Sequence, residues 1–348
     1  MKAMIVYNPA AGLHAPPTEM SEVVRLLNAE GIEVVGPKPT LGPGDATTYA
    51  REAVAHGCEA IFVAGGDGTL AQVADGLIGS DTALGVLPGG TGNVFARQLN
   101  LPVAGPLHPK PMLEATRALL AGNIRRVDVG SVTLQGGIVR HFLAWSGIGF
   151  DAMVNRAVNA DPERKRQLGL AAFALTAFMS LRDMAGTATR LRVDGTRANC
   201  RLLMLVVNNI QLYGVVFKMA ENAVIDDGEL DVYAFQGKDP SRILLHTARL
   251  ALRRHVTDPQ VGIYRGRRIE IAPRRPLPVH VDGDYVGETP AIIEIMPHAL
   301  NLMVPASAPP GLFTSGAGIE QHHESVGEWM QRVAHEVQHA IKERSAAP

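Results

Sequence analysis

The sequence predicts an α/β protein with an N-terminal parallel-sheet domain and a C-terminal antiparallel β-rich domain. Three observations support this fold class. Strands and helices alternate over the first hundred residues, which is typical of a parallel sheet covered on both faces. Glycine-containing turns follow three of the expected strands. After Arg126, the pattern changes to short strands joined by short turns.

The first part of the chain contains four expected strands, at 3–7, 32–35, 60–64 and 84–87. Helices are expected between and after them at 19–28, 45–56, 69–78 and 93–99. The first helix shows why: Met20, Val23, Val24 and Leu27 recur at the spacing of an apolar helix face. Ligands of such sheets bind beyond the carboxyl ends of the strands, so the turns there are the first place to look for function.

The second part is expected to be mostly strands. They are predicted at 127–134, 139–146, 190–193, 202–207, 230–235, 268–272, 278–281 and 291–296, with helices at 162–183 and 241–254. A Pro/Gly/Ser/Ala segment at 305–318 is typical of a linker, and a polar helix is expected at 320–344. We therefore predict domains at 1–126 and 127–305, followed by a linker and C-terminal helix at 306–348.

Composition narrows the functional classes. The chain has 348 residues and a formal net charge of −1, so no whole-protein field attracts nucleic acid, and we expect no nucleic-acid partner. Cys58 and Cys200 alone provide neither a disulfide framework nor a metal-site spacing, which favours a reducing compartment. The apolar stretch at 168–181 is too short and too interrupted to span a membrane. We expect a cytoplasmic protein.

The turn at Gly65, Gly66, Asp67, Gly68 and Thr69 carries the strongest chemical signal. Glycines without a Cβ let backbone N–H groups close around phosphate oxygens, and the following helix adds its positive dipole end. A carboxylate facing phosphates needs a cation between them, and Mg²⁺ prefers carboxylate, water and phosphate oxygens. Asp67 is therefore a candidate Mg²⁺-side residue. Without further signals, a solvated glycine turn would explain the same residues.

Two more turns favour a polyphosphate ligand. One runs from Asn8 to Gly12, and the other from Gly89 to Asn93, where Thr91 offers a hydroxyl. Thr40 offers another hydroxyl before the second helix. The spacing of a P-loop is absent, and so is the full dinucleotide fingerprint, because Ala71 stands where its last glycine would be.

Taken together, these motifs resemble the diacylglycerol kinase catalytic domain. This superfamily also includes sphingosine and ceramide kinases and, more distantly, NAD kinases and phosphofructokinases, so an NAD kinase/phosphofructokinase-like fold is implied for the first domain. The similarity extends over residues 1–305. Its later motifs are Gly147-Ile148-Gly149-Phe150-Asp151, Asn208-Asn209, Asp226-Asp227-Gly228-Glu229-Leu230-Asp231 and Val281-Asp282-Gly283-Asp284.

The resemblance implies an ATP- and Mg²⁺-dependent lipid kinase, with diacylglycerol as the first candidate acceptor. The ATP-binding residues it implies are Asn8, Pro9, Ala10, Ala11, Gly12, Thr40, Gly65, Gly66, Asp67, Gly68, Thr69, Leu70, Ala71, Gly90, Thr91 and Asn93. A structural Mg²⁺ would be held by Asp227 and by the main chain near Val224 and Glu229, in addition to Mg²⁺ on the side of Asp67. The other acceptors left open are a sphingoid base or ceramide, phosphatidylglycerol and NAD.

The resemblance also implies that the Asp282-Gly283-Asp284 turn reaches back to the nucleotide. Relatives usually have a glutamate as proton acceptor where this chain has the shorter Asp284, so both Asp282 and Asp284 are kept as catalytic candidates beside Asp67. A second departure is Ala71, where relatives often have Asn. Without the resemblance, Asp-Gly would indicate a hairpin turn and no more.

Lipid contact is expected where basic and apolar residues lie together. Residues 241–280 contain nine arginines against Asp258 and Glu270, and Arg164-Lys165-Arg166 precedes the apolar helix at 168–181. Such segments suit a peripheral contact with an anionic leaflet, although a solvated basic face would explain them equally well.

The C-terminal helix contains a competing motif. His335, Glu336 and His339 form the H-E-x-x-H pattern of zinc metallopeptidases, and His322 or His323 offers a third ligand. The two histidines fall opposite the apolar stripe of this helix, and the segment follows the linker. We therefore expect the helix to pack on the protein or on the partner subunit of a homodimer, and we keep the zinc site as a remote alternative.

Overall fold

The computed structural model describes residues 1–11, 17–90, 92–105, 107–160, 185–215, 217–239 and 241–314. The chain divides into two compact units. Unit 1 consists of Met1–Val129, Asn209–Asp227 and Pro297–Phe313, and unit 2 includes Gly130–Asn208 and Gly228–Met296. The units are therefore not two uninterrupted halves of the sequence, since the chain returns to unit 1 twice. The domain boundary predicted after Arg126 stays a prediction.

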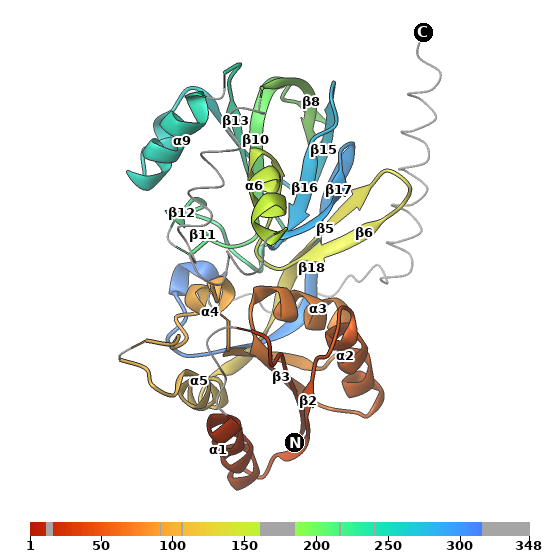
Figure 1. Cartoon of the computed structure of the whole chain (residues 1–348), viewed down its shortest axis with the longest axis vertical. Helices are drawn as coiled ribbons and strands as arrows, with labels where there is room; N and C mark the ends of the chain where they lie inside the picture. The colour runs from red at the N-terminus through yellow and green to blue at the C-terminus, as the bar shows by residue number, and fades with distance from the viewer. Residues whose placement is uncertain are drawn as a thin grey trace. The chain divides into compact units, whose positions relative to one another are not determined.

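The core of unit 1 is a parallel sheet, as predicted. Its strands are β1 (Lys2–Tyr7), β2 (Glu33–Pro39), β3 (Ala60–Gly65) and β4 (Ala83–Pro88), in the order β2-β1-β3-β4. Figure 1 labels β2 and β3 of this sheet. Tyr7 pairs with Pro39 and with Ala64, and Gly65 pairs with Pro88. This register brings the carboxyl ends of all four strands to one edge of the sheet, where the functional turns begin.

Helices flank this sheet. They are α1 (Pro17–Ala29), α2 (Asp45–Ala55), α3 (Asp67–Leu77), α4 (Val94–Gln98) and α5 (Pro111–Leu120). The predicted apolar stripe of α1 is confirmed by the burial of Met20, Val23 and Leu27. Close packing of α2 and α3 depends on Gly76, because a Cβ there would lie 2.6 Å from Cβ of Ala50. Unit 1 also contains the short hairpin β11 (Leu212–Tyr213) and β12 (Phe217–Lys218) and the turn η3 (Pro310–Leu312).

Unit 2 is built from antiparallel strands, which confirms the β-rich prediction. Its elements are β6 (Val139–Phe142), β7 (Trp145–Gly149), α6 (Phe150–Asn159), β8 (Thr187–Val193), β9 (Thr196–Arg197), β10 (Cys200–Asn208), β13 (Leu230–Gln236), α9 (Ser241–Ala251), η2 (His255–Thr257), β14 (Val261–Gly266), β15 (Arg268–Pro273), β16 (Pro278–Val281) and β17 (Asp284–Glu288). The long strands β5 (Asn123–Leu134) and β18 (Ala291–Val304) each begin in one unit and end in the other.

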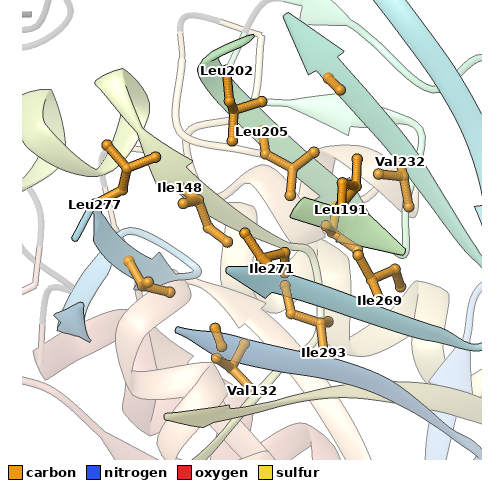
Figure 2. Packing of buried hydrophobic residues seen from close by; sticks show 14 of the residues in the cluster. Val132, Ile148, Leu191, Leu202, Leu205, Val232, Ile269, Ile271, Leu277 and Ile293 are labelled. Atoms are coloured by element: carbon orange, nitrogen blue, oxygen red, sulfur yellow. The ribbon is translucent and has the colours of Figure 1, made fainter. Parts of the chain in front are cut away.

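The core of unit 2 follows from alternation along these strands. In β8, buried and exposed residues alternate without exception, so one face is buried and the other faces solvent. Leu191, Leu205, Ile148, Ile271 and Ile293 converge from five strands onto one buried cluster (Figure 2). Close packing of these aliphatic side chains is the main stabilisation of this unit.

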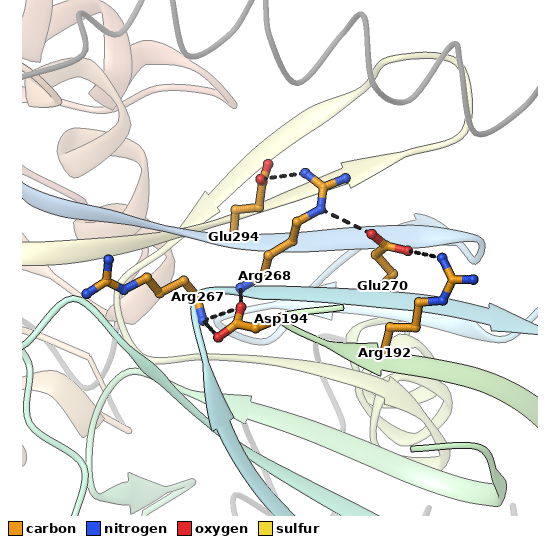
Figure 3. A network of polar contacts seen from close by, with 6 residues as sticks. All are labelled: Arg192, Asp194, Arg267, Arg268, Glu270 and Glu294. Carbon is orange, nitrogen blue, oxygen red and sulfur yellow. Dashed lines mark hydrogen bonds and ion pairs between the residues drawn. The ribbon is translucent and has the colours of Figure 1, made fainter. Parts of the chain in front are cut away.

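The solvent-facing side of the same strands carries a charged network. Arg192 pairs with Glu270 at 3.5 Å, and Arg268 pairs with both Glu270 at 3.2 Å and Glu294 at 2.7 Å (Figure 3). Asp194 accepts the backbone N–H groups of Arg267 and Arg268. The exposed Arg192–Glu270 pair contributes less than about 1 kcal/mol. Glu294 is buried, so its pair with Arg268 mainly offsets the cost of burying that carboxylate.

Sequence patterns missed several elements. The helices α5 and α6 and the strands β14 and β17 were not predicted, and the strand expected to end at 296 continues to Val304. The helices expected at 162–183 and 320–344 lie outside the described residues, as do Arg164, Lys165, Arg166, His322, His323, His335, Glu336 and His339. Within the described ranges, no helix has the length and apolar character that crossing a bilayer requires.

Candidate active site

Two glycine turns touch at the carboxyl edge of the unit 1 sheet. The N–H of Gly89 donates to the carbonyl of Gly65 at 3.0 Å. A Cβ on Gly90 would lie 2.6 Å from Cα of Gly66, a distance that side chains do not tolerate. Glycine is therefore required by the close approach of two backbones. The result is a surface of bare peptide groups where β3 gives way to α3.

Asn93 braces the second turn. It adopts the left-handed conformation, with φ of 49°, which Asn tolerates better than most residues. Its side-chain oxygen accepts the N–H of Gly90 at 2.9 Å, and its amide donates to the carbonyl of Gly90 at 2.6 Å. Arg97 donates to the carbonyl of Gly92 at 3.0 Å. Hydrogen bonds within the turn therefore fix its conformation. Thr91, which belongs to this turn, is not among the described residues.

Asp67 links the two turns. One carboxylate oxygen accepts the N–H of Val94 and the other accepts the N–H of Phe95, both at 3.1 Å. These N–H groups lie in the first turn of α4 and have no acceptor within the helix, and a negative charge is favoured there. Burial raises the pKa of the Asp67 carboxyl, although the backbone N–H groups of Phe95 and Val94 and the charge of Arg97 oppose the rise. The predicted Mg²⁺ role of Asp67 stays a prediction.

Asn8 ties the first turn to the glycine turn. Its amide donates to the Thr69 hydroxyl at 3.1 Å, and its side-chain oxygen accepts the N–H of Ala10 at 2.9 Å. The N–H of Thr40 donates to the carbonyl of Tyr7 at 2.8 Å, so Thr40 lies at the same edge. The structure therefore brings together most of the predicted nucleotide residues. Pro9 and Ala10 are exposed, Ala11 and Ala71 are half-buried, Leu70 is buried in α3, and Gly12 lies outside the described residues.

The expected structural metal site at Asp227, Val224 and Glu229 stays a prediction. Val224 and Asp227 belong to unit 1 and Glu229 to unit 2. The Glu229 carboxylate pairs with Arg265 at 3.0 Å, and the neighbouring Asp226 pairs with Arg125 at 3.1 Å. Across the described ranges, no group of three or more His, Cys, Asp or Glu side chains has the arrangement of a metal site. A cation there would depend on main-chain carbonyls beside Asp227.

Asp282 is a structural brace in unit 2. It adopts the left-handed conformation, with φ of 46°. One carboxylate oxygen accepts the N–H of Leu143 at 2.8 Å, and the other accepts those of Ala144 at 2.9 Å and Trp145 at 3.0 Å. These bonds hold the connection between β6 and β7. A carboxylate with three N–H partners is a poor proton acceptor, because hydrogen bonds to the charged form favour that form.

Asp284 has a different environment. It is exposed and begins β17, one residue beyond the Gly283 turn. That turn is fixed by α6 and β16: the amide of Asn159 donates to the carbonyl of Gly283 at 2.8 Å, and the N–H of Gly283 donates to Nδ1 of His280 at 3.1 Å. Of the two candidate bases, Asp284 is the one whose side chain faces solvent.

His280 and Asp151 were missed as a pair by sequence reasoning. Both are buried, and Nε2 of His280 lies 2.6 Å from the Asp151 carboxylate. Asp151 also accepts the Asn155 amide at 3.1 Å. The sequence feature that could have indicated this pair is the motif from Gly147 to Asp151. A Cβ on Gly147 would lie 2.2 Å from Nε2 of His280 and closer still to Asp151, so this glycine makes room for the pair.

Comparisons with known proteins indicate the family of this chain. The family model of the diacylglycerol kinase catalytic domain matches residues 2–132, and that of the YegS C-terminal NAD kinase beta sandwich-like domain matches residues 145–304. A diacylglycerol kinase of Bacillus subtilis is 27% identical over 292 residues, which are 83% of this chain and 91% of that protein. A diacylglycerol kinase of Mycobacterium tuberculosis is 28% identical over 307 residues, 87% of this chain and 95% of that protein.

Solved structures show the same fold. A crystal structure of a diacylglycerol kinase from Bacillus anthracis (strain Sterne) superposes with a TM-score of 0.65 at 20% identity, covering 88% of this chain and 98% of that one. A second crystal structure from that strain reaches a TM-score of 0.71 at 25% identity with the same coverage. With two family models that follow each other along the sequence and relatives aligned over most of their length, the chain belongs to the diacylglycerol kinase catalytic-domain family and is a phosphotransferase with an alcohol group as acceptor.

Proposed function

We propose that this chain is an ATP- and Mg²⁺-dependent lipid kinase that converts diacylglycerol to phosphatidic acid. The contact between the two glycine turns at Gly66 and Gly90 is the observation that supports it most. Bare peptide groups at the start of α3 suit phosphate oxygens, because backbone N–H groups and the positive end of the helix both favour negative charge. The names of the relatives from Bacillus subtilis and Mycobacterium tuberculosis support diacylglycerol as the acceptor.

In the proposed reaction, the lipid hydroxyl oxygen attacks the γ-phosphorus of ATP. The bond between that phosphorus and the β–γ bridging oxygen breaks, ADP leaves, and the hydroxyl proton passes to Asp284. Phosphoryl transfer has a loose transition state, so orientation and charge neutralisation do most of the work. The exposed Asp284 suits proton transfer, whereas the three N–H donors on Asp282 suit a brace.

Mg²⁺ enters this proposal as part of the ATP complex. Mg²⁺ in such sites usually takes one or two carboxylates together with phosphate oxygens and waters, so no cage of three acidic side chains is required. Asp67 is the carboxylate of the glycine turn and would face the phosphates, directly or through water. A second Mg²⁺ at Asp227 and the main chain near Val224 and Glu229 is also proposed, with a structural role.

Several alcohols could accept the phosphoryl group. Sphingoid bases, ceramide, phosphatidylglycerol and NAD each carry a hydroxyl, and diacylglycerol is the first candidate before them. A lipid acceptor requires transient contact with a membrane surface, which we propose from the cytoplasmic side. The homodimer and the zinc-peptidase reading of His335 and His339 stay predictions.

The test is transfer of label from γ-labelled ATP·Mg²⁺ into mixed micelles of each lipid, with NAD as a soluble acceptor. Labelled phosphatidic acid that disappears in Asp284→Asn, with that variant folded, supports both the reaction and the base. Label in NAD alone would overturn the lipid assignment. If neither a lipid nor NAD is labelled, the kinase proposal fails, and zinc content and peptidase activity become the next measurements.

A further inference from the structure

The helix α9 of unit 2 has two apolar faces. Ile243, His246 and Leu250 are buried and form its inner face. Leu244 and Leu245 in the helix and Leu252 just after it are 53%, 38% and 66% exposed. With 100° between successive residues, these leucines project from the side opposite the buried one. A surface helix packed on one side typically carries polar residues on the other, so this outward leucine face is unusual.

A buried polar cluster fixes the orientation of this helix. Nδ1 of His246 lies 3.2 Å from the Asp258 carboxylate, and Nε2 lies 3.0 Å from the carbonyl of Gln236. Arg249 pairs with Asp258 as well. Burial tends to raise the pKa of Asp258, but the N–H of Gln260 and the charges of Arg249 and His246 outweigh it, so the pKa lies below its usual range. The leucines are thus held outward by the fold.

Neighbouring elements extend the outward leucine face. Val256 in η2 is 51% exposed and Ile263 in β14 is 42% exposed. In the described part of the chain, β14 pairs with β13 alone, so it is an edge strand, and it contacts η2. Five large apolar side chains therefore lie exposed on α9, η2 and β14 and the turn between them, more than singly scattered residues would give.

A basic hollow lies between residues of β8, β10, β13 and β15. It has a volume of about 810 Å³ and is lined by Arg190, Arg201 and Arg274 from three strands or their ends. A second hollow of about 350 Å³ shares Arg201 and Gln236 with the first and adds Lys238 and Arg242, the latter from α9 itself. Among the described residues, Arg190, Arg201 and Arg274 pair with no carboxylate, and Asp239 is the one acidic side chain in the two linings.

The hollow suits an anion rather than covalent chemistry. Cys200 lines it, but burial raises the pKa of this thiol to about 11, so it stays protonated and is a weak nucleophile. Over residues 238–258, five Lys and Arg face two Asp, a local charge of 5 − 2 = +3 in a chain of net charge −1. Positive charge is therefore concentrated where the exposed leucines are.

We propose that α9, η2, β14 and the adjoining basic hollow form the surface by which this chain binds an anionic phospholipid bilayer. Lipid phosphates occupy the basic hollow, and Leu244, Leu245 and Leu252 insert at the boundary between headgroups and acyl chains. Arginine next to leucine on one helix is the composition of interfacial helices, and each basic residue near an anionic surface adds to binding. This inference deepens the proposed function and rests on it for the reason why a bilayer must be reached.

Vesicle flotation tests the surface directly, with phosphatidylcholine vesicles compared with vesicles that also contain phosphatidylglycerol. We expect binding to the anionic vesicles alone, and loss of that binding at high salt. Arg190→Glu/Arg274→Glu and Leu244→Gln/Leu252→Gln should each weaken it by about tenfold or more. Arg140→Glu/Arg197→Glu and Leu107→Gln/Ile138→Gln change equally exposed residues elsewhere and should bind like the unchanged protein.

Kinase assays on a short-chain diacylglycerol dispersed as monomers separate this proposal from the function. Variants of the surface should keep that activity and lose activity on vesicles. Unchanged vesicle binding in both surface variants, or equal loss in the control variants, would overturn the docking surface whatever the kinase activity is. A change in oligomeric state in Leu244→Gln/Leu252→Gln with vesicle binding intact would also overturn it, in favour of a subunit contact. Absence of lipid phosphorylation in every protein, with selective vesicle binding retained, would instead remove the proposed function.

Discussion

His280 uses both of its ring nitrogens inside unit 2. Nδ1 accepts the N–H of Gly283, so the single proton of the neutral ring lies on Nε2, which donates to the Asp151 carboxylate at 2.6 Å. The ring is fully buried and packs edge-on against Trp145, with 6.3 Å between ring centroids. Because Gly283 precedes Asp284, this pair links the buried end of α6 to the turn that presents the proposed base. We therefore propose that His280 positions Asp284.

Replacing His280 should therefore affect turnover and stability together. In His280→Ala, the buried Asp151 carboxylate loses its main donor, and we expect the free energy of unfolding to fall by about 3 kcal/mol. The Gly283 turn loses an anchor, so kcat should fall by about tenfold or more while KM for ATP changes little. Urea unfolding and steady-state kinetics on short-chain diacylglycerol measure the two effects.

The same unit offers a matched control. His246 forms another buried pair with a carboxylate, that of Asp258. His246→Ala should lose stability in a similar way but retain kcat on the dispersed substrate, because its partners are Asp258 and the carbonyl of Gln236 and not the turn before Asp284. His280→Gln, which can still donate and accept, should recover part of the turnover. Equal kcat losses in both alanine variants would show that His280 has no positioning role.

We expect substitution of Asp282 to lower stability and substitution of Asp284 to lower turnover. Asp282→Ala leaves three N–H groups of the β6–β7 connection without their acceptor, so we expect a loss of about 2–4 kcal/mol in the free energy of unfolding. Asp284→Asn alters an exposed side chain and should change stability by less than about 0.5 kcal/mol, while kcat falls about 100-fold or more. Chemical unfolding and kcat of each variant give the comparison, and wild-type turnover in Asp284→Asn would remove it as the base.

Local patterns predicted unit 1 well because its elements are regular. Each strand is followed by a helix with a clear apolar stripe, and glycines mark the turns, so the order of elements and most of the nucleotide turn follow from the sequence. The contact of Gly66 with Gly90 could not be predicted from the sequence, because it depends on the strand register that pairs Gly65 with Pro88. The bonds of Asp67 to N–H groups of α4 could not be predicted from the pattern either, and its place beside a cation stays a prediction.

Unit 2 was harder to predict for a physical reason. Its pairs join residues that are far apart in the chain, such as Asp151 with His280 and Asp282 with Leu143, and nothing local marks them. The helix α6 follows β7 directly, so its apolar residues were not separated from those of the strand. The structural role of Asp282 appears only when β6, β7 and β16 are brought together.

The glycine contact gives a prediction for ATP binding. In Gly90→Ala, the new methyl group would meet the backbone of Gly66 at 2.6 Å, so one of the two turns must move. Overpacking of this kind costs about 1–3 kcal/mol of stability, and the displaced N–H groups should raise KM for ATP. Thermal unfolding and ATP titration of the kinase measure both. Gly42→Ala is the control, because nothing lies within 4 Å of its added carbon, and an unchanged KM in Gly90→Ala would separate this turn from the nucleotide.

The raised pKa of Asp67 predicts a pH dependence whose sign can be worked out. The folded protein holds the Asp67 proton more tightly than the unfolded chain, whose value is near 3.8. As pH rises from there through the folded pKa, the stability contributed by this group is lost, because the folded state must give up a proton that it binds better. The free energy of unfolding of wild type minus that of Asp67→Asn should therefore fall over this window and stay level above it.

Mg²⁺ gives this prediction its link to function. If Asp67 faces the ATP·Mg²⁺ complex, the nearby cation favours the carboxylate form, and the window should move to lower pH when Mg²⁺ and a non-hydrolysable ATP analogue are bound. Urea unfolding of both proteins across the acid range, with and without the ligand, measures the shift. Asp81→Asn is the control, since its side chain is 94% exposed. If the pH range of this stability loss is the same with and without the ligand, Asp67 does not face the ATP·Mg²⁺ complex. Its role would then be limited to its hydrogen bonds with the N–H groups of Val94 and Phe95 in α4.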